Sequence, residues 1–185
     1  MESLQQRFQR LCETPSDINQ HLPTLADYAK RCRHVTEFGV REAVSTTAWL
    51  WGLQGIAGGT LVCYDLNDST GLQSLMHMDL AGVSFEFRRI DALAAMIDPT
   101  DLLFIDTIHS YGQLKAELYQ HAELVRRWIV LHDTESFRAH DEGGNGKGCG
   151  LWPAVEEFVA EGAFELSDHF SFNNGLTILE RRRAA

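Results

Sequence analysis

HVTEFGVREAVS, residues 34–45, carries the first indication of the class of fold. The β-branched and apolar run at 35–38 predicts a strand, Gly39 a tight turn, and residues 42–53 a helix. This order opens many α/β domains that bind a ligand, because glycine lets the backbone approach it and the helix N-terminus offers free N–H groups. Glu37, at the strand end, is expected to face that crevice. An ordinary strand–helix turn has the same pattern, so this stretch alone does not establish a site.

Strand and helix patterns alternate after this stretch. Apolar runs predict strands at 60–64, 83–90, 101–105 and 128–131, with helices at 71–80, 93–97 and 113–127 and another beginning at 152. Apolar strands alternating with amphipathic helices indicate a parallel sheet covered on both faces. Residues 164–181 predict two further strands, and the Asn174-Gly175 pair between them favours a tight antiparallel hairpin. The expected fold is therefore α/β, with a mostly parallel sheet that ends in an antiparallel hairpin.

Residues 1–33 are predicted to be helical, with one helix at the start and a second over 24–32. We expect this segment to form an N-terminal helical cap and residues 34–185 to form the main domain. The cap could close one end of the sheet, cover a substrate or meet a partner subunit, and sequence does not choose among these roles.

Composition narrows the class of protein. The formal net charge of -10 argues against a nucleic-acid-binding surface, which needs a basic patch. The four cysteines, Cys12, Cys32, Cys63 and Cys149, form no Cys-x-x-Cys pair, so neither a disulfide framework nor a zinc site is expected. Reduced thiols, and the lack of an apolar run long enough to span a membrane or of a signal-peptide core, predict a cytoplasmic protein without membrane contact.

Four predicted strands end in a carboxylate: Asp65, Asp91, Asp106 and Asp133. Ligands of parallel α/β sheets bind outside the carboxyl ends of the strands. Together with Glu37, these acids predict a ligand site along that edge. The glycine-rich loop at 138–150 follows one of them, and a long loop in a compact domain is usually functional or disordered, so we expect it to act as a lid.

The segments EFGVREAVST, FIDTIHSY, VLHDT and NNGLTIL carry a resemblance to a known family. Over residues 33–181 the chain resembles the class I S-adenosylmethionine (SAM)-dependent methyltransferases, and within them the cephalosporin-hydroxylase-like and macrolide or sugar O-methyltransferases. The resemblance implies a Rossmann-like three-layer α/β/α sandwich with a seven-stranded sheet. It implies an enzyme (EC 2.1.1.-) that methylates a hydroxyl of a small natural product or sugar.

The resemblance assigns a cofactor role to residues of the first strands. Glu37 and Gly39 match the first SAM motif, and Ser45 matches the position that helps to hold the methionine carboxylate. Asp65 matches the acid that accepts hydrogen bonds from the ribose hydroxyls, since a carboxylate accepts two O–H donors at once.

Later strand ends match the adenine and methyl-transfer positions. Asp91 and Ala92 match the turn beside the adenine, and Asp106 matches the acid near the sulfonium. In the metal-dependent members, that acid joins the two residues after the next strand, here His132 and Asp133, in holding Mg²⁺.

The chain departs from the family pattern at three positions. Ala43 replaces a second glycine of the first motif and is expected to tighten the cofactor pocket, and Ile108 replaces a carboxylate. His132 stands where a carboxylate is common, which weakens the case for Mg²⁺ and suits a softer divalent ion.

Two catalytic routes stay open. A divalent ion on Asp106, His132 and Asp133 could lower the pKa of the acceptor hydroxyl. Alternatively, His109 or His132 could be the general base, although packing or hydrogen-bonding roles explain both histidines as well.

Two other functions compete with methyl transfer. One is a non-catalytic SAM-binding or scaffold protein, which Ala43 and Ile108 keep open. The other is a nicotinamide-dependent oxidoreductase, against which the missing Gly-x-Gly-x-x-Gly pattern argues. The expected partner is a small-molecule acceptor, and the short cap favours a homo-oligomer, such as a dimer, that completes the pocket.

Overall fold

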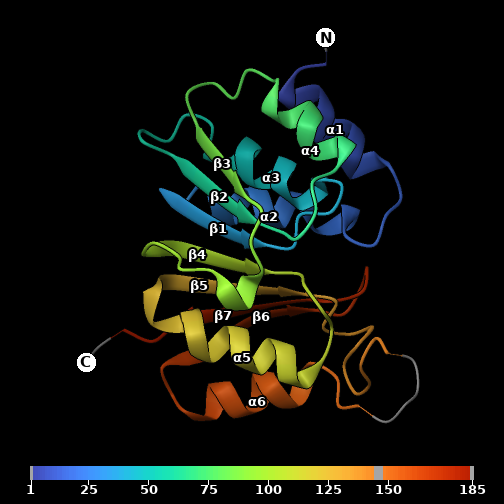
Figure 1. Cartoon of the computed structure of the whole chain (residues 1–185), viewed down its shortest axis with the longest axis vertical. Helices are drawn as coiled ribbons and strands as arrows, with labels where there is room; N and C mark the ends of the chain where they lie inside the picture. The colour runs from blue at the N-terminus through green and yellow to red at the C-terminus, as the bar shows by residue number, and fades with distance from the viewer. Residues whose placement is uncertain (1, 144–147, 184–185) are drawn as a thin grey trace. The chain divides into compact units, whose positions relative to one another are not determined.

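The chain divides into two compact units, Met1–Ala95 and Met96–Ala185, in the computed structural model, which describes residues 2–143 and 148–183. The predicted cap, residues 1–33, lies within the first unit. Each unit contains both strands and helices (Figure 1).

The first unit contains three parallel strands in the order β3-β2-β1. His34 pairs with Thr60 at the start of β1, and Thr60 pairs in turn with Ser84, so the strands begin level and their carboxyl ends share one edge. Its elements are α1 (Leu4–Glu13), η1 (Asn19–His21), α2 (Leu22–Ala29), β1 (His34–Phe38), α3 (Val44–Leu53), β2 (Thr60–Tyr64), α4 (Thr70–Met76), β3 (Ser84–Arg88) and η2 (Ala92–Ala94).

Helix α3 is the centre of the first unit. It is apolar on all sides and nearly all of its residues are buried, which is the pattern of a core helix rather than a surface helix. Gly52 explains how α2 can approach it, because a Cβ atom there would lie 2.3 Å from the carbonyl oxygen of Ala26. The sequence predicts this helix, although it begins at Val44 and not at residue 42.

The second unit contains four strands in the order β4-β5-β7-β6. Strands β4 and β5 are parallel, whereas β7 is antiparallel to both β5 and β6. Helices α5 and α6 lie side by side (Figure 1). The elements are β4 (Thr100–Ile105), α5 (Tyr111–His121), η3 (Ala122–Leu124), β5 (Val125–His132), α6 (Trp152–Ala160), β6 (Phe164–Phe170) and β7 (Leu176–Arg181).

Several predicted boundaries are wrong, as the helix expected over 71–80 ends at Met76 and the strand expected over 83–90 ends at Arg88. Residues 125–127 belong to β5 and not to the preceding helix, because Val125 pairs with Thr100 of β4. Residues 92–94 form a single 3₁₀ turn in place of the predicted helix over 93–97. The C-terminal hairpin is present, but Phe170 pairs with Leu176, so its loop is longer than the predicted two-residue turn, and both Asn173 and Asn174 adopt positive φ.

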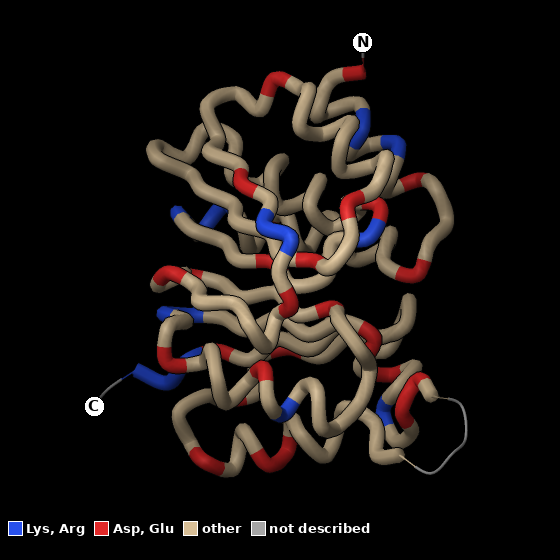
Figure 2. Tube along the Cα trace, in the orientation of Figure 1, with Lys and Arg blue, Asp and Glu red and all other residues tan. Residues whose placement is uncertain are grey.

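Acidic residues are spread over both units, and Arg181–Arg183 lie beside the C-terminus (Figure 2). None of the helices described is long and apolar enough to cross a membrane.

Arg7 is a buried charge that links three parts of the first unit. Its Nε donates to Thr47 Oγ1 at 3.0 Å, and its Nη2 donates to the carbonyls of Gly71 at 3.3 Å and Glu42 at 3.4 Å. Burial lowers the pKa of the guanidinium. The side chain therefore connects α1 to α3, to the start of α4 and to the loop between β1 and α3.

Replacing Arg7 by methionine is expected to lower the free energy of unfolding by about 1–3 kcal/mol, because buried acceptors lose their donors. Chemical denaturation measures this change. Arg10 of the same helix is half exposed and pairs with Glu2 at the surface, so Arg10→Met should cost less than about 1 kcal/mol. Equal effects of the two substitutions would contradict the role given to Arg7.

Candidate functional site

The loop between β1 and α3 has an unusual backbone. Gly39, Arg41 and Ala43 all have positive φ, which is costly for the two residues that carry a Cβ atom. Ala43 is the N-cap of α3 and has no side-chain hydrogen bond to the helix, so no side chain of the cap satisfies the first N–H groups. The alanine predicted to tighten the cofactor pocket therefore sits at the start of α3 in a left-handed conformation.

Asp65, directly after β2, holds this loop in place. Its Oδ2 accepts hydrogen bonds from the backbone N–H groups of Val40 at 2.7 Å and Arg41 at 3.1 Å. Its Oδ1 accepts from the N–H of Asn67 at 2.9 Å. A carboxylate oxygen has two lone pairs, so Oδ1 can accept a further donor while it supports the turn.

Glu37 is fully buried. It accepts hydrogen bonds from Ser45 Oγ at 2.6 Å, Thr46 Oγ1 at 2.7 Å and Cys63 Sγ at 3.0 Å. The expected open position of Glu37 at a crevice is thus not what the structure shows. The carboxylate instead fixes the first turn of α3, and the cofactor roles of Glu37 and Ser45 stay predictions.

The predicted adenine residues lie at the end of β3. Asp91 is the N-cap of the 3₁₀ turn η2, and its Oδ1 accepts a hydrogen bond from the N–H of Leu93 at 2.8 Å. Ala92 is buried and Asp91 is exposed. A capping role thus explains Asp91 without a ligand.

Gly71, at the start of α4, contacts the same loop. A Cβ atom there would lie 2.1 Å from the carbonyl oxygen of Glu42, while Glu42 Oε2 accepts a hydrogen bond from the Gly71 N–H at 3.2 Å. Gly71→Ala is expected to displace the loop and cost about 1–3 kcal/mol of stability. In contrast, Gly112 in α5 has open space around it, so Gly112→Ala should stabilise by about 0.4–1 kcal/mol.

Thermal unfolding of the two alanine variants checks this prediction. The pair is matched because both glycines lie in the first turn of a helix. Similar melting temperatures for both variants would show that Gly71 is not required for close packing of the loop.

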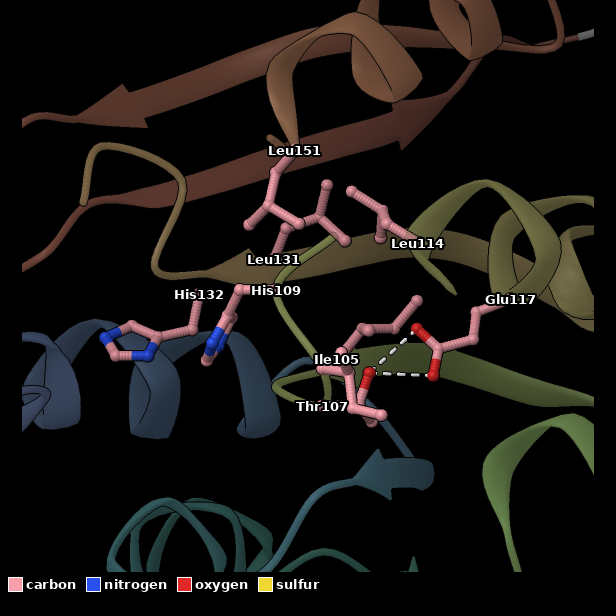
Figure 3. Close-up of a pocket in the computed structure, with 9 residues that line it drawn as sticks. Ile105, Thr107, His109, Leu114, Glu117, Leu131, His132 and Leu151 are labelled. Atoms are coloured by element: carbon pink, nitrogen blue, oxygen red, sulfur yellow. Dashed lines mark hydrogen bonds between the residues drawn. The ribbon is translucent and has the colours of Figure 1, made fainter. Parts of the chain in front are cut away.

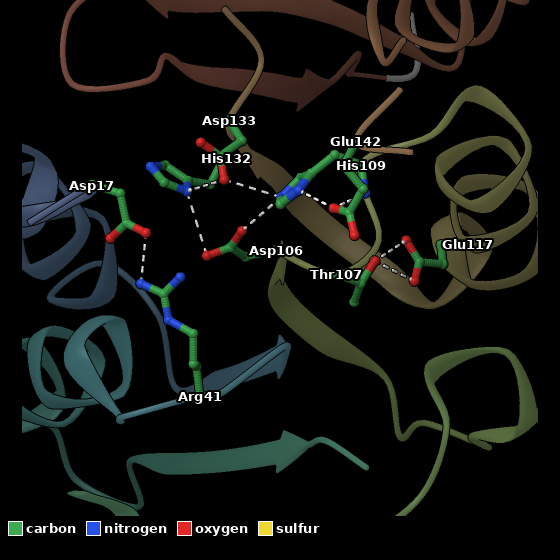
Figure 4. Close-up of polar contacts among 9 residues, drawn as sticks. All are labelled: Asp17, Arg41, Asp106, Thr107, His109, Glu117, His132, Asp133 and Glu142. Carbon is green, nitrogen blue, oxygen red and sulfur yellow. Dashed lines mark hydrogen bonds and ion pairs between the residues drawn. The ribbon is translucent and has the colours of Figure 1, made fainter. Parts of the chain in front are cut away.

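The second unit brings four predicted site residues together at the ends of β4 and β5 (Figure 4). His109 Nε2 lies 3.2 Å from Asp106 Oδ1 and 3.0 Å from Asp133 Oδ2. His132 Nδ1 lies 3.4 Å from Asp106 Oδ2 and 3.4 Å from Asp133 Oδ2. Two carboxylates are therefore shared by two imidazoles.

Asp133 has a strained backbone and an unsatisfied oxygen. Its φ is 59°, in the left-handed region that few non-glycine residues adopt, and the residue is 5% exposed. Its Oδ1 is buried and accepts no hydrogen bond from any described residue. Strain and an unsatisfied buried oxygen are typical of functional positions.

The cluster changes the pKa of each member. Burial alone would lower the pKa of His109 and of His132, but the neighbouring carboxylates of Asp106 and Asp133 outweigh it and raise both to about 10. Burial would raise the pKa of both carboxyls, but the histidines hold them below their usual range. Each carboxylate and each imidazole thus favours the charged form of its neighbour.

Glu142 completes the surroundings of His109. Its Oε2 lies 2.5 Å from the ring atom His109 Nδ1 and also accepts a hydrogen bond from the backbone N–H of His109 at 3.0 Å. The backbone N–H of Glu142 donates to the His109 carbonyl at 3.1 Å. The His109 ring also stacks on Phe137 with 4.5 Å between ring centroids. Sequence reasoning missed Glu142 and Phe137, because neither belongs to a motif.

The described part of the predicted lid, residues 138–143 and 148–150, is attached to this cluster. His140 and Cys149 form an isolated antiparallel bridge, and the Cys149 carbonyl accepts from the N–H of Tyr111 at 3.0 Å. Residues 144–147 of the predicted lid lie outside the described residues. The role of a lid stays a prediction.

A pocket in the second unit extends from the two histidines into the space between β4, β5 and α5 (Figure 3). Its cavity volume of about 10 Å³ is roughly the space of one water molecule, far below the about 300–1,000 Å³ of a typical ligand pocket. Thr107 Oγ1 donates to both carboxylate oxygens of the buried Glu117, at 2.7 and 3.0 Å. The pocket is lined by Ile105, Thr107, Ile108, His109, Leu114, Glu117, Leu131, His132 and Leu151.

The geometry can be compared with the metal site that the resemblance implies. The ligand atoms of Asp106, His109 and Asp133 lie within 4.8 Å of one another and could hold a metal ion. The predicted set was Asp106, His132 and Asp133; the cluster with this spacing has His109 in place of His132, and the predicted set stays a prediction. Two carboxylates with an imidazole between them fit a divalent cation, but they provide fewer oxygen donors than Mg²⁺ prefers.

Comparison with known proteins concerns the fold. No family model matches the sequence, and no curated protein matches it. Solved structures do match the fold of the chain. A protein from Corynebacterium glutamicum has a TM-score of 0.68 at 16% sequence identity, and the match covers 98% of this chain and 90% of that one.

The O-methyltransferase TomG from Streptomyces achromogenes, involved in tomaymycin synthesis and solved with SAM, has a TM-score of 0.63 at 16% identity over 98% of this chain and 90% of that one. The N-methyltransferase NodS from Bradyrhizobium japonicum has a TM-score of 0.60 at 12% identity, over 89% of this chain and 94% of that one. The chain shares the fold of these methyltransferases. The predicted Rossmann-like fold class, mostly parallel with antiparallel C-terminal strands, is confirmed.

Proposed function

We propose that the protein is a SAM-dependent methyltransferase that acts on a hydroxyl group of a small molecule. The fold likeness to the SAM-bound O-methyltransferase TomG over 98% of the chain is the observation that carries the proposal. The first unit supports it, because Asp65, to which the sequence resemblance assigns ribose binding, accepts hydrogen bonds from the loop at 39–43 that carries the first motif.

The first unit would bind the cofactor. Asp65 Oδ1 would accept a hydrogen bond from a ribose hydroxyl. The free N–H groups at the start of α3, which has no side-chain cap, would bind the methionine carboxylate. Glu37 would act indirectly, since it fixes Ser45 and Thr46 in the first turn of that helix.

When bound, SAM supplies a methyl group on a sulfonium; an acceptor oxygen forms the new O–C bond as the C–S bond breaks and its electron pair returns to sulfur. The second unit would manage the acceptor proton. Asp106 and Asp133, beside His109 and His132, provide carboxylate oxygens that could accept a hydrogen bond from the acceptor hydroxyl. A divalent cation on the carboxylates would fit the same geometry.

A hydroxyl acceptor is favoured because the cluster offers carboxylate and imidazole groups within hydrogen-bonding distance of one another. An aliphatic or phenolic hydroxyl must lose its proton during transfer, and positioned carboxylate–histidine pairs assist such steps. The fold itself does not choose the acceptor, since the N-methyltransferase NodS shares it.

Product analysis tests this proposal. The purified chain would be incubated with isotopically labelled SAM and a panel of catechols, sugars, hydroxylated macrolides and amines, with and without divalent metals, and labelled products would be detected by mass spectrometry. Label in an O-methyl product supports the proposal, and label only in an N-methyl product would contradict the hydroxyl assignment. S-adenosylhomocysteine (SAH) binding without any product would favour the non-catalytic alternative.

A further inference from the structure

We propose that Asp106, His109 and Asp133 form a site for a borderline transition-metal cation such as Zn²⁺ or Co²⁺, selective against Mg²⁺, in which Glu142 orients the histidine ligand. The inference deepens the proposed function, since it concerns the same cluster. Its test uses the metal alone and does not depend on SAM.

The spacing of the ligand atoms suits a metal ion. Metal–ligand bonds of about 2.1 Å place neighbouring ligand atoms about 3.0 Å apart in an octahedron and about 3.4 Å apart in a tetrahedron. His109 Nε2 lies 3.0 Å from Asp133 Oδ2 and 3.2 Å from Asp106 Oδ1, between these values. The two distances from His109 therefore suit a single ion, and the ligand atoms of all three residues lie within 4.8 Å of one another.

The contacts of His109 select Nε2 as the ligand atom. Glu142 Oε2 lies 2.5 Å from Nδ1, so that nitrogen keeps its proton and donates it to the carboxylate. In a neutral ring with that tautomer, the Nε2 lone pair faces two carboxylates. A cation between Nε2 and the carboxylates converts this repulsion into attraction, and a carboxylate behind a ligand histidine is the usual second partner of a metal site.

An independent observation also indicates a ligand here. Asp133 Oδ1 is buried and accepts no hydrogen bond from the described residues, although burying a carboxylate oxygen without a partner is costly. Coordination by both oxygens of Asp133 would satisfy it.

The donor set decides the class of metal. Mg²⁺ prefers oxygen donors and retains water, whereas imidazole suits Zn²⁺, Co²⁺ and similar ions. Ile108, 54% exposed beside His109, contributes no oxygen at the position where the family has a carboxylate. The chain thus offers one nitrogen and two carboxylates in place of an all-oxygen set.

Metal titration of the whole chain tests the proposal. After treatment with a chelator, the chain would be titrated with Co²⁺, Zn²⁺ and Mg²⁺ in a calorimeter, and the visible absorption of bound Co²⁺ would report its ligands. The variants are His109→Ala, Asp133→Asn and Glu142→Gln, with Glu123→Gln, an exposed acid of the same unit, as the matched control. Circular dichroism checks that each variant is folded.

We expect Co²⁺ and Zn²⁺ to bind at least about 100-fold more tightly than Mg²⁺. His109→Ala and Asp133→Asn should abolish the Co²⁺ spectrum, and Glu142→Gln should weaken binding about 10–100-fold, while Glu123→Gln leaves it unchanged. Equal affinity for Mg²⁺, no metal binding, or an unchanged Co²⁺ spectrum in folded His109→Ala would overturn the proposal. SAH binding by a chain that fails these tests would leave the proposed function intact.

Discussion

Replacing Asp65 by alanine should abolish SAH binding, with a loss of affinity of at least about 100-fold. Asp65 supports the loop at 39–43 through the N–H groups of Val40 and Arg41, and its Oδ1 is the proposed acceptor for the ribose. Each hydrogen bond to a charged group contributes about 1.5–3 kcal/mol, so losing two or more reaches this magnitude. Calorimetric titration with SAH measures the change.

Two controls separate binding from folding. Asp27→Ala removes an exposed carboxylate of α2 that pairs with Lys30, and it should leave SAH affinity unchanged. Asp65→Asn keeps a side-chain oxygen that can accept hydrogen bonds from the loop at 39–43, so it should be more stable than Asp65→Ala. Its affinity for SAH should nevertheless be weak. An Asp65→Ala variant that is folded and binds SAH as the natural chain does would contradict the role of Asp65.

Replacing Asp106 by asparagine should lower the rate of methyl transfer about 10²–10⁴-fold, because the substitution removes one of the two charges shared by His109 and His132. The shape of the side chain is kept, so the fold should persist. SAH carries no sulfonium, and its affinity should change by less than about tenfold. Single-turnover transfer from labelled SAM measures the rate.

Asp101→Asn is the matched control for this substitution. Asp101 lies in the same strand, β4, and its Oδ1 lies 3.4 Å from Arg126 Nη1. Its substitution should leave the rate unchanged. Equal rates for Asp106→Asn and the natural chain would show that the cluster does not take part in transfer.

Local patterns predict most of the fold. The strand–turn–helix at 34–53 and the apolar runs ending in acids suffice, because period and turn chemistry are local properties of a chain. They place Asp106, His132 and Asp133 correctly at neighbouring strand ends. Boundaries fail where tertiary pairing overrides local preference, as at Val125, which pairs with Thr100.

Long-range polar contacts could not be predicted in the same way. Glu142 follows His109 by 33 residues in a glycine-rich loop, and nothing in its neighbours marks it. The enclosure of Glu37 by Ser45, Thr46 and Cys63 depends on how α3 packs on the strands, which the residues alone do not reveal. The sequence pattern predicts Arg7 to be a surface residue of an amphipathic helix, yet the residue is only 6% exposed.

Calorimetric titration of the natural chain with SAH, with and without Co²⁺, tests whether the protein binds the cofactor of a methyltransferase. We expect saturable binding of one SAH per chain, which is lost in Asp65→Ala and retained in Asp106→Asn. No SAH binding in either condition, by a chain shown to be folded, would contradict the methyltransferase assignment.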